Sequence, residues 1–504
     1  METITIPEGV ESISAYAIWC CENLQSIIIP ESTRNIEEGN FKSCIRLQSI
    51  TVTPSNDAYS SIDGVLFNAE GTELLKYPEG KEDETYSIPN GVTRIPSWAF
   101  EDCQYLKDVE LPNTLQRISS YAFFNCGEMI GITLSAGVVN VGTYAFSSTP
   151  LKWIRVDSGN TAFSSIDGVL FNKDATKLII YPEGKNTERY ILPDSVVWVG
   201  PCAFERNDSL KNVVLPSSLT TIDACAFSFC GSLTEIKIPK SVNVIRSGAF
   251  QKCVSLEAVY FTGNAPQIGS NPFAGVAAKC YYPDTNATWT EDVLQDYGGD
   301  LTWMPYELPL EDLDRSGQLG ENLTWELTED GTLTISGLGE MPYYWSRDQY
   351  PWDRLRPEIQ KVVVGLGVET VGNYAFAKCE NLTEVSLPNT LRQIQNYAFY
   401  ACPELTEITI PKKVYYLYPA AFKSCNKLRT VRLQQKDGNC RIEEDTFSGV
   451  TADVYFYGNA WQQSDRKDYG GHLTWIDLRE KLERIDLKSF STLIVGSGIG
   501  CPFS

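Results

Sequence analysis

The sequence has 504 residues, of which 43% are hydrophobic and 21% are charged, a balance that excludes an intrinsically disordered chain. Its 64 acidic against 42 basic side chains give a formal charge of −22, which argues against binding to nucleic-acid phosphates or to anionic lipid surfaces. No apolar run of about eighteen residues occurs, and the first residues lack the basic and apolar regions of a signal peptide, so neither membrane insertion nor an export signal is predicted.

Residues 1–261 contain a repeat that is marked by apolar-Pro pairs. Pairs spaced by 23 residues are Pro7 and Pro30, Pro89 and Pro112, and Pro193, Pro216 and Pro239. Each unit continues through Val or Leu and Ile to Ala-Phe, with Cys three residues later and Leu three after that, as in LPNTLQRISSYAFFNCGEMIGITL. A unit of this length cannot bury its own apolar side, so the sequence predicts a solenoid of stacked rungs.

One column of the repeat predicts the core of this solenoid, because it is almost entirely Phe. The column consists of Phe41, Phe100, Phe123, Phe146, Phe204, Phe227, Phe250, Phe376, Phe399 and Phe422, with Ile18 in the first unit. The alternating residues before each Pro predict a parallel β-sheet along one face. Proline lacks a backbone donor and ends each strand, while the Tyr-Ala-Phe stretch predicts a short helical turn on the opposite face.

Two segments, 54–88 and 158–192, interrupt the first array. Both contain the string SSIDGVLFN, followed by ELLKYPEGK in the first segment and KLIIYPEGK in the second, and Asp63 and Asp167 lie 104 residues apart. Apolar runs on either side of a short polar turn predict a β-hairpin. We therefore expect a hairpin inserted between two rungs at each place.

The two arrays are expected to end in similar β-rich caps, because NPFAGV and DYGGDLTW in the first correspond to DTFSGV and DYGGHLTW in the second. An acidic, Gly-containing stretch between the arrays predicts a linker. The predicted order is a first array at 1–261, its C-terminal cap at 262–306, a linker at 307–320, a β-rich N-terminal cap at 321–364, a second array at 365–433, its C-terminal cap at 434–478, and a tail of unassigned structure at 479–504.

The repeat units, the SSIDGVLFN segments and the DYGG-x-LTW caps together resemble the BspA-like leucine-rich-repeat family of bacterial surface and secreted proteins. The resemblance covers nearly all of residues 1–478 and rests on three motifs that agree in order and spacing. It implies a leucine-rich-repeat solenoid that acts in adhesion and interaction, at the cell surface or outside the cell. The chain begins inside a rung and ends without a sortase motif, which suggests a fragment of a longer protein and leaves the export route open.

The side chains needed for catalysis or for a metal site are sparse. The single histidine, His472, lies in a cap string where the first cap has Asp300, so it is expected to be a solvated cap residue rather than part of a catalytic pair. The string from Asp312 to Gly317 begins like a calcium loop, but Leu323 stands where that loop requires Glu. We expect no enzymatic activity, no catalytic or metal-binding residues and no cofactor.

A cysteine follows the Phe column by three residues in most rungs. The cysteines concerned are Cys21, Cys44, Cys103, Cys126, Cys230, Cys253, Cys379, Cys402 and Cys425. Thr149 and Asn207 fill the same column without a thiol, which favours buried reduced thiols over disulfides between neighbouring rungs. The state of a second pair, Cys202 and Cys225, stays open at this stage.

The outward positions of successive strands vary in chemistry and form the candidate partner-binding surface. Exposed aromatic and cationic residues are typical of binding hot spots, although surface drift would give similar variation. The candidate residues are Asp108, Glu110, Trp153, Arg155, Glu235, Lys237 and Tyr260. A separate aromatic cluster, MPYYWSRDQYPW, is compatible with glycan stacking, but cap packing explains it better.

These observations predict a non-catalytic, monomeric, acidic interaction protein without nucleic-acid or membrane contacts. It is expected to be an adhesin-type module that binds a host or microbial protein, with a glycan as the alternative ligand. The alternatives are a structural spacer of a larger surface protein and a hydrolase acting on glycans. The sequence does not identify the partner.

Overall fold

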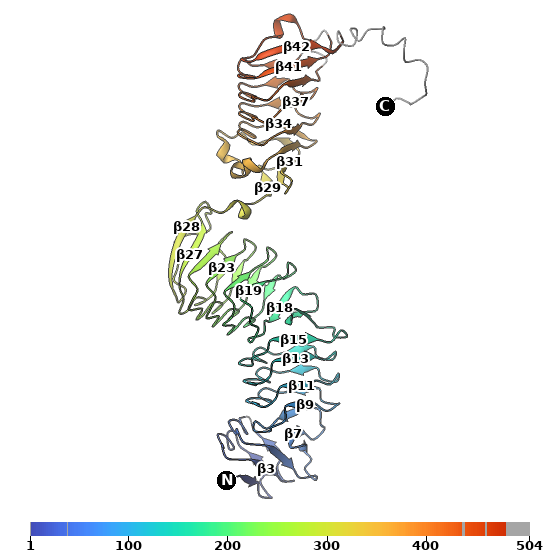
Figure 1. Cartoon of the computed structure of the whole chain (residues 1–504), viewed down its shortest axis with the longest axis vertical. Coiled ribbons are helices and arrows are strands. Elements are labelled where there is room, and N and C mark those ends of the chain that lie inside the picture. Colours follow the sequence, from blue (N-terminus) through green and yellow to red (C-terminus); the bar gives the residue numbers. More distant parts are fainter. Residues whose placement is uncertain (1, 38, 436–438, 459–460, 480–504) are drawn as a thin grey trace, which may run out of the picture. The chain divides into compact units, whose positions relative to one another are not determined.

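The computed structural model describes residues 2–37, 39–435, 439–458 and 461–479. These residues form two compact units, Met1–Leu308 and Pro309–Ser504, and most of the predicted tail lies outside the described residues. Within each unit, short strands stack in chain order as a solenoid (Figure 1). Repeat solenoid architecture is thus confirmed, and each unit can be described by itself.

One side of unit 1 is formed by parallel strands that stack with the period of the repeat. Ile4 pairs with Ile27, and Ile27 pairs with Ile50, so the same column of successive rungs stays in register. The strands are β1 (Thr3–Thr5), β3 (Ser26–Ile29), β5 (Ser49–Val52), β9 (Thr85–Ser87), β11 (Asp108–Glu110), β13 (Gly131–Leu134), β15 (Trp153–Val156), β19 (Arg189–Ile191), β21 (Asn212–Val214), β23 (Glu235–Ile238), β25 (Ala258–Phe261), β27 (Ala277–Pro283) and β28 (Asp300–Tyr306). We call this side the strand face.

A second series of strands, two residues each, runs along another side of unit 1. Ile95 pairs with Ile118 and Ile118 with Val141, which places the Ile column of the repeat in a parallel ladder of its own. The members are β2 (Ser12–Ile13), β4 (Asn35–Ile36), β10 (Arg94–Ile95), β12 (Arg117–Ile118), β14 (Asn140–Val141), β20 (Trp198–Val199), β22 (Thr221–Ile222), β24 (Val244–Ile245) and β26 (Gln267–Ile268). We call it the second ladder.

The expected helical turn around Ala-Phe was wrong. Each such stretch, here called the back turn, contains residues with positive φ, as at Tyr121 (60°) and Asn125 (56°), and an α-helix requires φ near −63°. The backbone bonds instead to the next rung, since the N–H of Phe123 donates to the carbonyl of Ala145 at 2.8 Å. The helices whose bounds both lie within the described residues are four 3₁₀ segments, Leu310–Asp312, Arg347–Gln349, Asp353–Glu358 and Gln463–Asp465, and none is a back turn.

The core of each unit is a stack of Phe rings. Phe227 is fully buried and lies 4.7 Å from Phe204 and 5.3 Å from Phe250, with nearly parallel ring planes. The same stacking runs from Phe376 to Phe399 in unit 2. Every ring therefore depends on the rungs on both sides of it for burial.

The cysteine column beside the core donates hydrogen bonds instead of forming disulfides. The Sγ of Cys253 lies 2.9 Å from the carbonyl oxygen of Phe227 in the preceding rung, and Thr149 makes the same bond to Phe123 at 2.5 Å. All cysteines of the described chain are free thiols, including the partly exposed Cys202 and Cys225. Burial raises the pKa of Cys44 to about 11, so its thiol stays protonated at neutral pH.

Each predicted insertion of unit 1 forms a three-stranded antiparallel element. The first consists of β6 (Tyr59–Ile62), β7 (Val65–Asn68) and β8 (Leu74–Lys76), and the second of β16 (Phe163–Ile166), β17 (Val169–Asn172) and β18 (Lys177–Ile180). The β18 strand pairs in parallel with β20 and thereby joins the second ladder. At the other end of the hairpin, the carbonyl of Gly168 accepts the N–H of Ile154 at 2.8 Å, so the hairpin turn adjoins the strand face.

Unit 2 repeats this construction behind an antiparallel cap. Strands β29 (Ser316–Leu319), β30 (Leu323–Leu327) and β31 (Thr332–Gly337) precede the parallel strands β33 (Lys361–Val364) and β35 (Glu384–Ser386). The strand face continues with β37 (Glu407–Ile410), β39 (Thr430–Leu433), β41 (Thr451–Phe456) and β42 (His472–Asp477). The second ladder consists of β32 (Gly339–Glu340), β34 (Val368–Val371), β36 (Gln393–Ile394), β38 (Tyr416–Leu417) and β40 (Arg441–Ile442).

The aromatic cluster before the second array divides into a buried and an exposed part. Tyr350 and Trp352 are buried, and the Trp352 ring lies parallel to that of Phe376, at the beginning of the Phe stack. Tyr343 and Trp345 are exposed and contact each other. Cap packing thus accounts for the buried pair.

Substitution of one core Phe tests whether the stack has nearest-neighbour coupling. The Phe227→Ala variant leaves a cavity between two rings and should lose about 3–5 kcal/mol of local stability. Hydrogen exchange followed by mass spectrometry should show faster exchange in the adjoining rungs and little change in distant ones.

The matched control is Val254→Ala, which shortens an exposed side chain in the following rung. A uniform rise in exchange along all of unit 1 would contradict nearest-neighbour coupling.

Candidate protein-interaction surface

The seven candidate residues lie on four strands of the strand face of unit 1. Asp108 and Glu110 belong to β11, Trp153 and Arg155 to β15, Glu235 and Lys237 to β23, and Tyr260 to β25. All are exposed except Trp153 and Tyr260, which are half-buried, and the residues between them on the strands are buried. Their outward position follows from the period of two along each strand.

Trp153 lies flat across the neighbouring strand. A Cβ built on Gly131 of β13 would collide with the Trp153 indole, and one built on Gly168 of the hairpin turn would lie 2.7 Å from its Cβ. The guanidinium carbon of Arg155 lies 4.2 Å from the centre of the Trp153 ring, within the range of a cation-π contact. Two glycines and an arginine therefore fix the orientation of this indole.

Tyr260 belongs to a second aromatic group, four strands further along unit 1. Its ring is stacked on Tyr281 of β27 at 4.7 Å, and Tyr306 of β28 lies edge-on to both at 6.0 Å. Lys237 occupies the register position beside Tyr260 on β23. Burial, followed by the neighbouring Tyr281 and Glu235, raises the pKa of Tyr260, so its hydroxyl remains a hydrogen-bond donor at neutral pH.

Sequence reasoning missed Tyr281 and Tyr306, because residues 262–306 were assigned to a cap. The structure continues the strand face through this cap, with β27 paired in parallel to β25 and β28 paired to β27. The alternation in AAKCYYP was the available signal.

The acidic candidates lie apart from one another. Glu110 accepts a hydrogen bond from the Ser87 hydroxyl at 2.6 Å, on the sheet of β9 and β11. Glu235 accepts one from the Asn212 side chain at 3.3 Å, on the sheet that begins at β19. The two glutamates therefore belong to different sheets and do not form one acidic patch.

The structure does not place the candidates on one continuous sheet. Trp153 and Arg155 belong to the sheet of β13 and β15, whereas Lys237 and Tyr260 belong to the sheet from β19 to β28. The hairpin β16–β18 enters the chain between these sheets. The candidate surface is therefore two aromatic and cationic groups, one around Trp153 and one around Tyr260.

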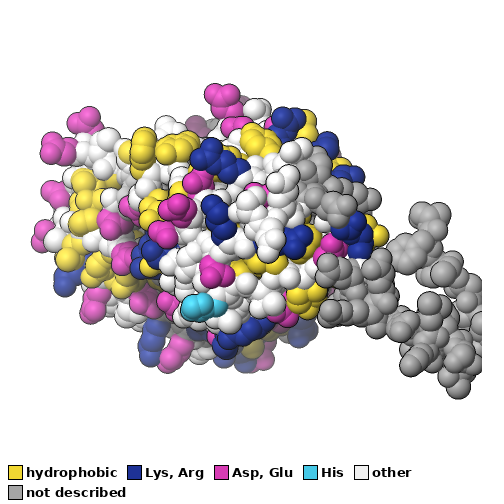
Figure 2. Space-filling view, turned by 90° about the horizontal axis from the view of Figure 1, so that it is seen from above, with side chains coloured by type: hydrophobic (Ala, Val, Ile, Leu, Met, Phe, Trp, Pro, Cys, Tyr) yellow, Lys and Arg dark blue, Asp and Glu magenta, His cyan; other side chains and the backbone are white. Residues whose placement is uncertain are grey.

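The single histidine of the chain lies on the last described strand of unit 2. His472 is exposed, begins β42, and pairs with Thr451, as Asp300 begins β28 and pairs with Ala277 in the other cap. Figure 2 shows this histidine at the surface, among acidic, basic and apolar side chains. Among the described residues, no three His, Cys, Asp or Glu side chains are placed to hold a metal ion, and no helix is long and apolar enough to cross a membrane.

The sequence matches the family model described as "BspA type Leucine rich repeat region (6 copies)" over residues 1–82, 79–186, 181–291 and 356–457. No curated protein matches the sequence. The matched ranges include both arrays.

Solved structures of bacterial leucine-rich-repeat proteins are similar over most of their length. A leucine-rich repeat protein from Eubacterium ventriosum is 19% identical, with 84% of this chain and 82% of that chain covered and a TM-score of 0.34. The pneumococcal vaccine antigen PcpA is 18% identical, with 94% and 89% covered and a TM-score of 0.37. A leucine rich cell surface protein from Faecalibacterium prausnitzii is 19% identical, with 87% and 89% covered and a TM-score of 0.32. Because these scores are low, the family assignment rests on the sequence model alone.

The close approach of Gly131 and Trp153 predicts a specific local response. In Gly131→Ala, the added methyl group should push the indole off strand β13, at a cost of about 1–3 kcal/mol in stability. The Trp153 Nε1–H resonance, assigned by its loss in Trp153→Ala, should move in spectra of nitrogen-15-labelled protein.

Gly127→Ala is the control, since its methyl group would meet only the amide end of the Gln104 side chain. An unchanged Trp153 resonance in Gly131→Ala would show that the glycine does not hold the ring in place.

Proposed function

Because the chain belongs to the BspA type leucine rich repeat family, we propose that it is a non-catalytic interaction module that binds a protein partner through the strand face of unit 1. Leucine-rich-repeat proteins generally mediate protein interactions, since stacking presents an extended surface. We expect this role to need no cofactor. Its place of action, by family resemblance, is the bacterial surface or the surrounding medium.

The pairing of Trp153 with Arg155 is the observation that carries this proposal. A half-buried indole held by two glycines and covered by a guanidinium is ordered before any partner arrives, so binding loses little side-chain entropy. Trp, Tyr and Arg are also the residue types most enriched in binding hot spots. Tyr260, with Tyr281 and Tyr306 packed against it, offers a second contact area.

The net charge indicates which partners the face favours. With a formal charge of −22, the protein attracts basic partners at long range, and the attraction weakens as salt screens it. A matrix or cell-surface protein with a basic patch and exposed apolar groups would match both the field and the aromatic contacts.

The proposal is tested by measuring binding of the purified chain to immobilised matrix proteins, cell-surface proteins and glycans. We expect saturable binding to a protein ligand, and at least about tenfold weaker binding for Trp153→Ala or Tyr260→Ala, because each removes an aromatic anchor. Tyr105→Ala removes an exposed ring that lies outside the strands and should bind like the parent.

Any of three results would overturn this function. Saturable binding that neither strand-face substitution weakens would place the interaction elsewhere. Binding to nothing at all would favour a structural spacer, and turnover of a glycan would favour a hydrolase.

A further inference from the structure

Two hollows lie at equivalent places in unit 1, where each inserted hairpin meets the rungs around it. The first has a volume of about 570 Å³ and is lined in part by Lys42, Lys76 and Trp98. The second has a volume of about 230 Å³ and is lined in part by Ile180 and Glu183. ELLKYPEGK contributes Leu75 and Lys76 to the first hollow, and KLIIYPEGK contributes residues 179–183 to the second. The two hollows can therefore be compared position by position.

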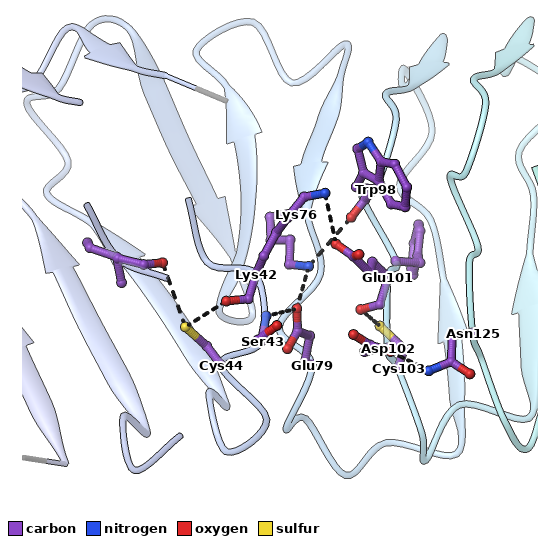
Figure 3. Close-up of polar contacts among 12 residues, drawn as sticks. Lys42, Ser43, Cys44, Lys76, Glu79, Trp98, Glu101, Asp102, Cys103 and Asn125 are labelled. Carbon is purple, nitrogen blue, oxygen red and sulfur yellow. Dashed lines mark hydrogen bonds and ion pairs between the residues drawn. The ribbon is translucent and has the colours of Figure 1, made fainter. Parts of the chain in front are cut away.

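The first hollow holds two ammonium groups beside two buried carboxylates. The Nζ of Lys76 lies 3.1 Å from Oε1 of Glu79, and both side chains are almost fully buried. The Nζ of Lys42 lies 3.4 Å from Oε2 of Glu101 and 3.7 Å from the centre of the Trp98 ring. Figure 3 shows the two lysines converging on the carboxylates from different segments of the chain.

The second hollow keeps both carboxylates and has neither lysine. Glu183 and Glu205 occupy the positions of the two glutamates, while Ile180 and Ser147 occupy those of the two lysines. These two substitutions remove two positive charges, whereas Arg206 stands where the first copy has Asp102. In the first hollow, lysines of the chain itself supply the ammonium groups that pair with the two glutamates. In the second hollow, the equivalent positions supply no ammonium group.

Glu183 has one backbone hydrogen-bond donor and both signs of charge around it. The carboxylate accepts the N–H of Ser148 at 2.8 Å. Burial raises its pKa to about 7, against the lowering effect of Ser148 and Arg206, and Glu205 and Asp208 raise it further. The charges facing Glu183 thus include one cation and two further carboxylates.

Arg206 does not replace the missing lysines. Its guanidinium carbon lies 5.2 Å from the centre of the Phe229 ring in the following rung, and its side chain is exposed. Burial likewise raises the pKa of Glu205. The two carboxylates therefore remain available for a cation from outside.

The walls of the second hollow suit an alkyl chain. Ile179, Ile180 and Trp198 are among the lining residues. Tyr144 also lines the hollow, and its ring is stacked on Tyr121 at 5.0 Å. Burial raises the pKa of the lining thiol Cys202 to about 12, so it adds no negative charge at neutral pH. Apolar walls over an acidic floor match an aliphatic amine.

We propose that the hollow around Glu183 binds a primary ammonium group on an alkyl chain, with Glu183 and Glu205 as its counterions. This site goes beyond the proposed function, because the hollow is lined by the second ladder and the back turns and not by the strand face. The ammonium comes from a lysine side chain of a partner protein or from a free diamine.

The test is calorimetric titration of the full chain with n-butylamine, with 1,5-diaminopentane and with a lysine residue blocked at both backbone ends. Binding of at least one amine with one site per chain is expected. Tighter binding of the blocked lysine than of the diamine would indicate a partner side chain, and the reverse would indicate a free diamine. No binding of any of the three would overturn the proposal.

Two variants separate the site from nonspecific attraction to an acidic protein. Glu183→Gln should weaken amine binding by about tenfold or more, because it removes one counterion. Ile180→Lys restores the lysine of the first hollow, so it should raise the melting temperature and abolish amine binding. Amine affinity that neither variant changes would overturn the proposal even if the parent binds.

The pH dependence gives an independent readout. Because the folded-state pKa of Glu183 lies near 7, above the ordinary 4.5, ionising it costs stability as the pH rises through this range. A bound ammonium favours the ionised form, so amine affinity should fall as the pH is lowered from 8 to about 5. The fall should be smaller in Glu183→Gln, where only Glu205 remains to titrate. Affinity that does not depend on pH in the parent would contradict Glu183 as the counterion.

Discussion

The whole structure depends on the burial of one Phe ring by the rings of the two neighbouring rungs. A rung has too few apolar residues to form a core alone, so its free energy of folding comes from the next rung. Ring spacings of 4.7 Å and 5.3 Å around Phe227 agree with the separation of neighbouring strands, which lets ring stacking and backbone pairing be satisfied together. Any insertion must therefore preserve this spacing. The second hairpin supplies β18 to the second ladder, and the first hairpin meets that ladder at one isolated bridge between Glu73 and Arg94.

The repeat, the Phe column and the two hairpins were predictable because each is a matter of period and apolar pattern. The thiol state of the cysteine column was predictable too, since Thr149 can donate the same hydrogen bond but cannot form a disulfide. The conformation of the back turns was not predictable. Their residues with positive φ include Tyr121 and Asn125, and a tyrosine in a sequence does not indicate positive φ.

Much of the candidate surface depends on contacts that no local pattern specifies. That Trp153 covers Gly131 requires knowing which residue of the neighbouring strand lies opposite, and the register shows this only once the strands are paired. The extension of the strand face to Tyr281 and Tyr306 likewise depends on pairing across a cap. The sequence did contain a signal for the hollow around Glu183, because Ile180 in KLIIYPEGK replaces Lys76 of ELLKYPEGK while the glutamate is kept.

The backbone bonds of the back turns bear on how such an array responds to pulling. In unit 1 neighbouring rungs are joined along the strand face, along the second ladder and at the back turn, where Phe123 bonds to Ala145. These bonds run along the stacking direction, so tension in that direction loads the three sets of bonds at a rung boundary together. A terminal rung is bonded on one side only, so we expect it to detach before an internal rung, and a pulled array should lengthen rung by rung.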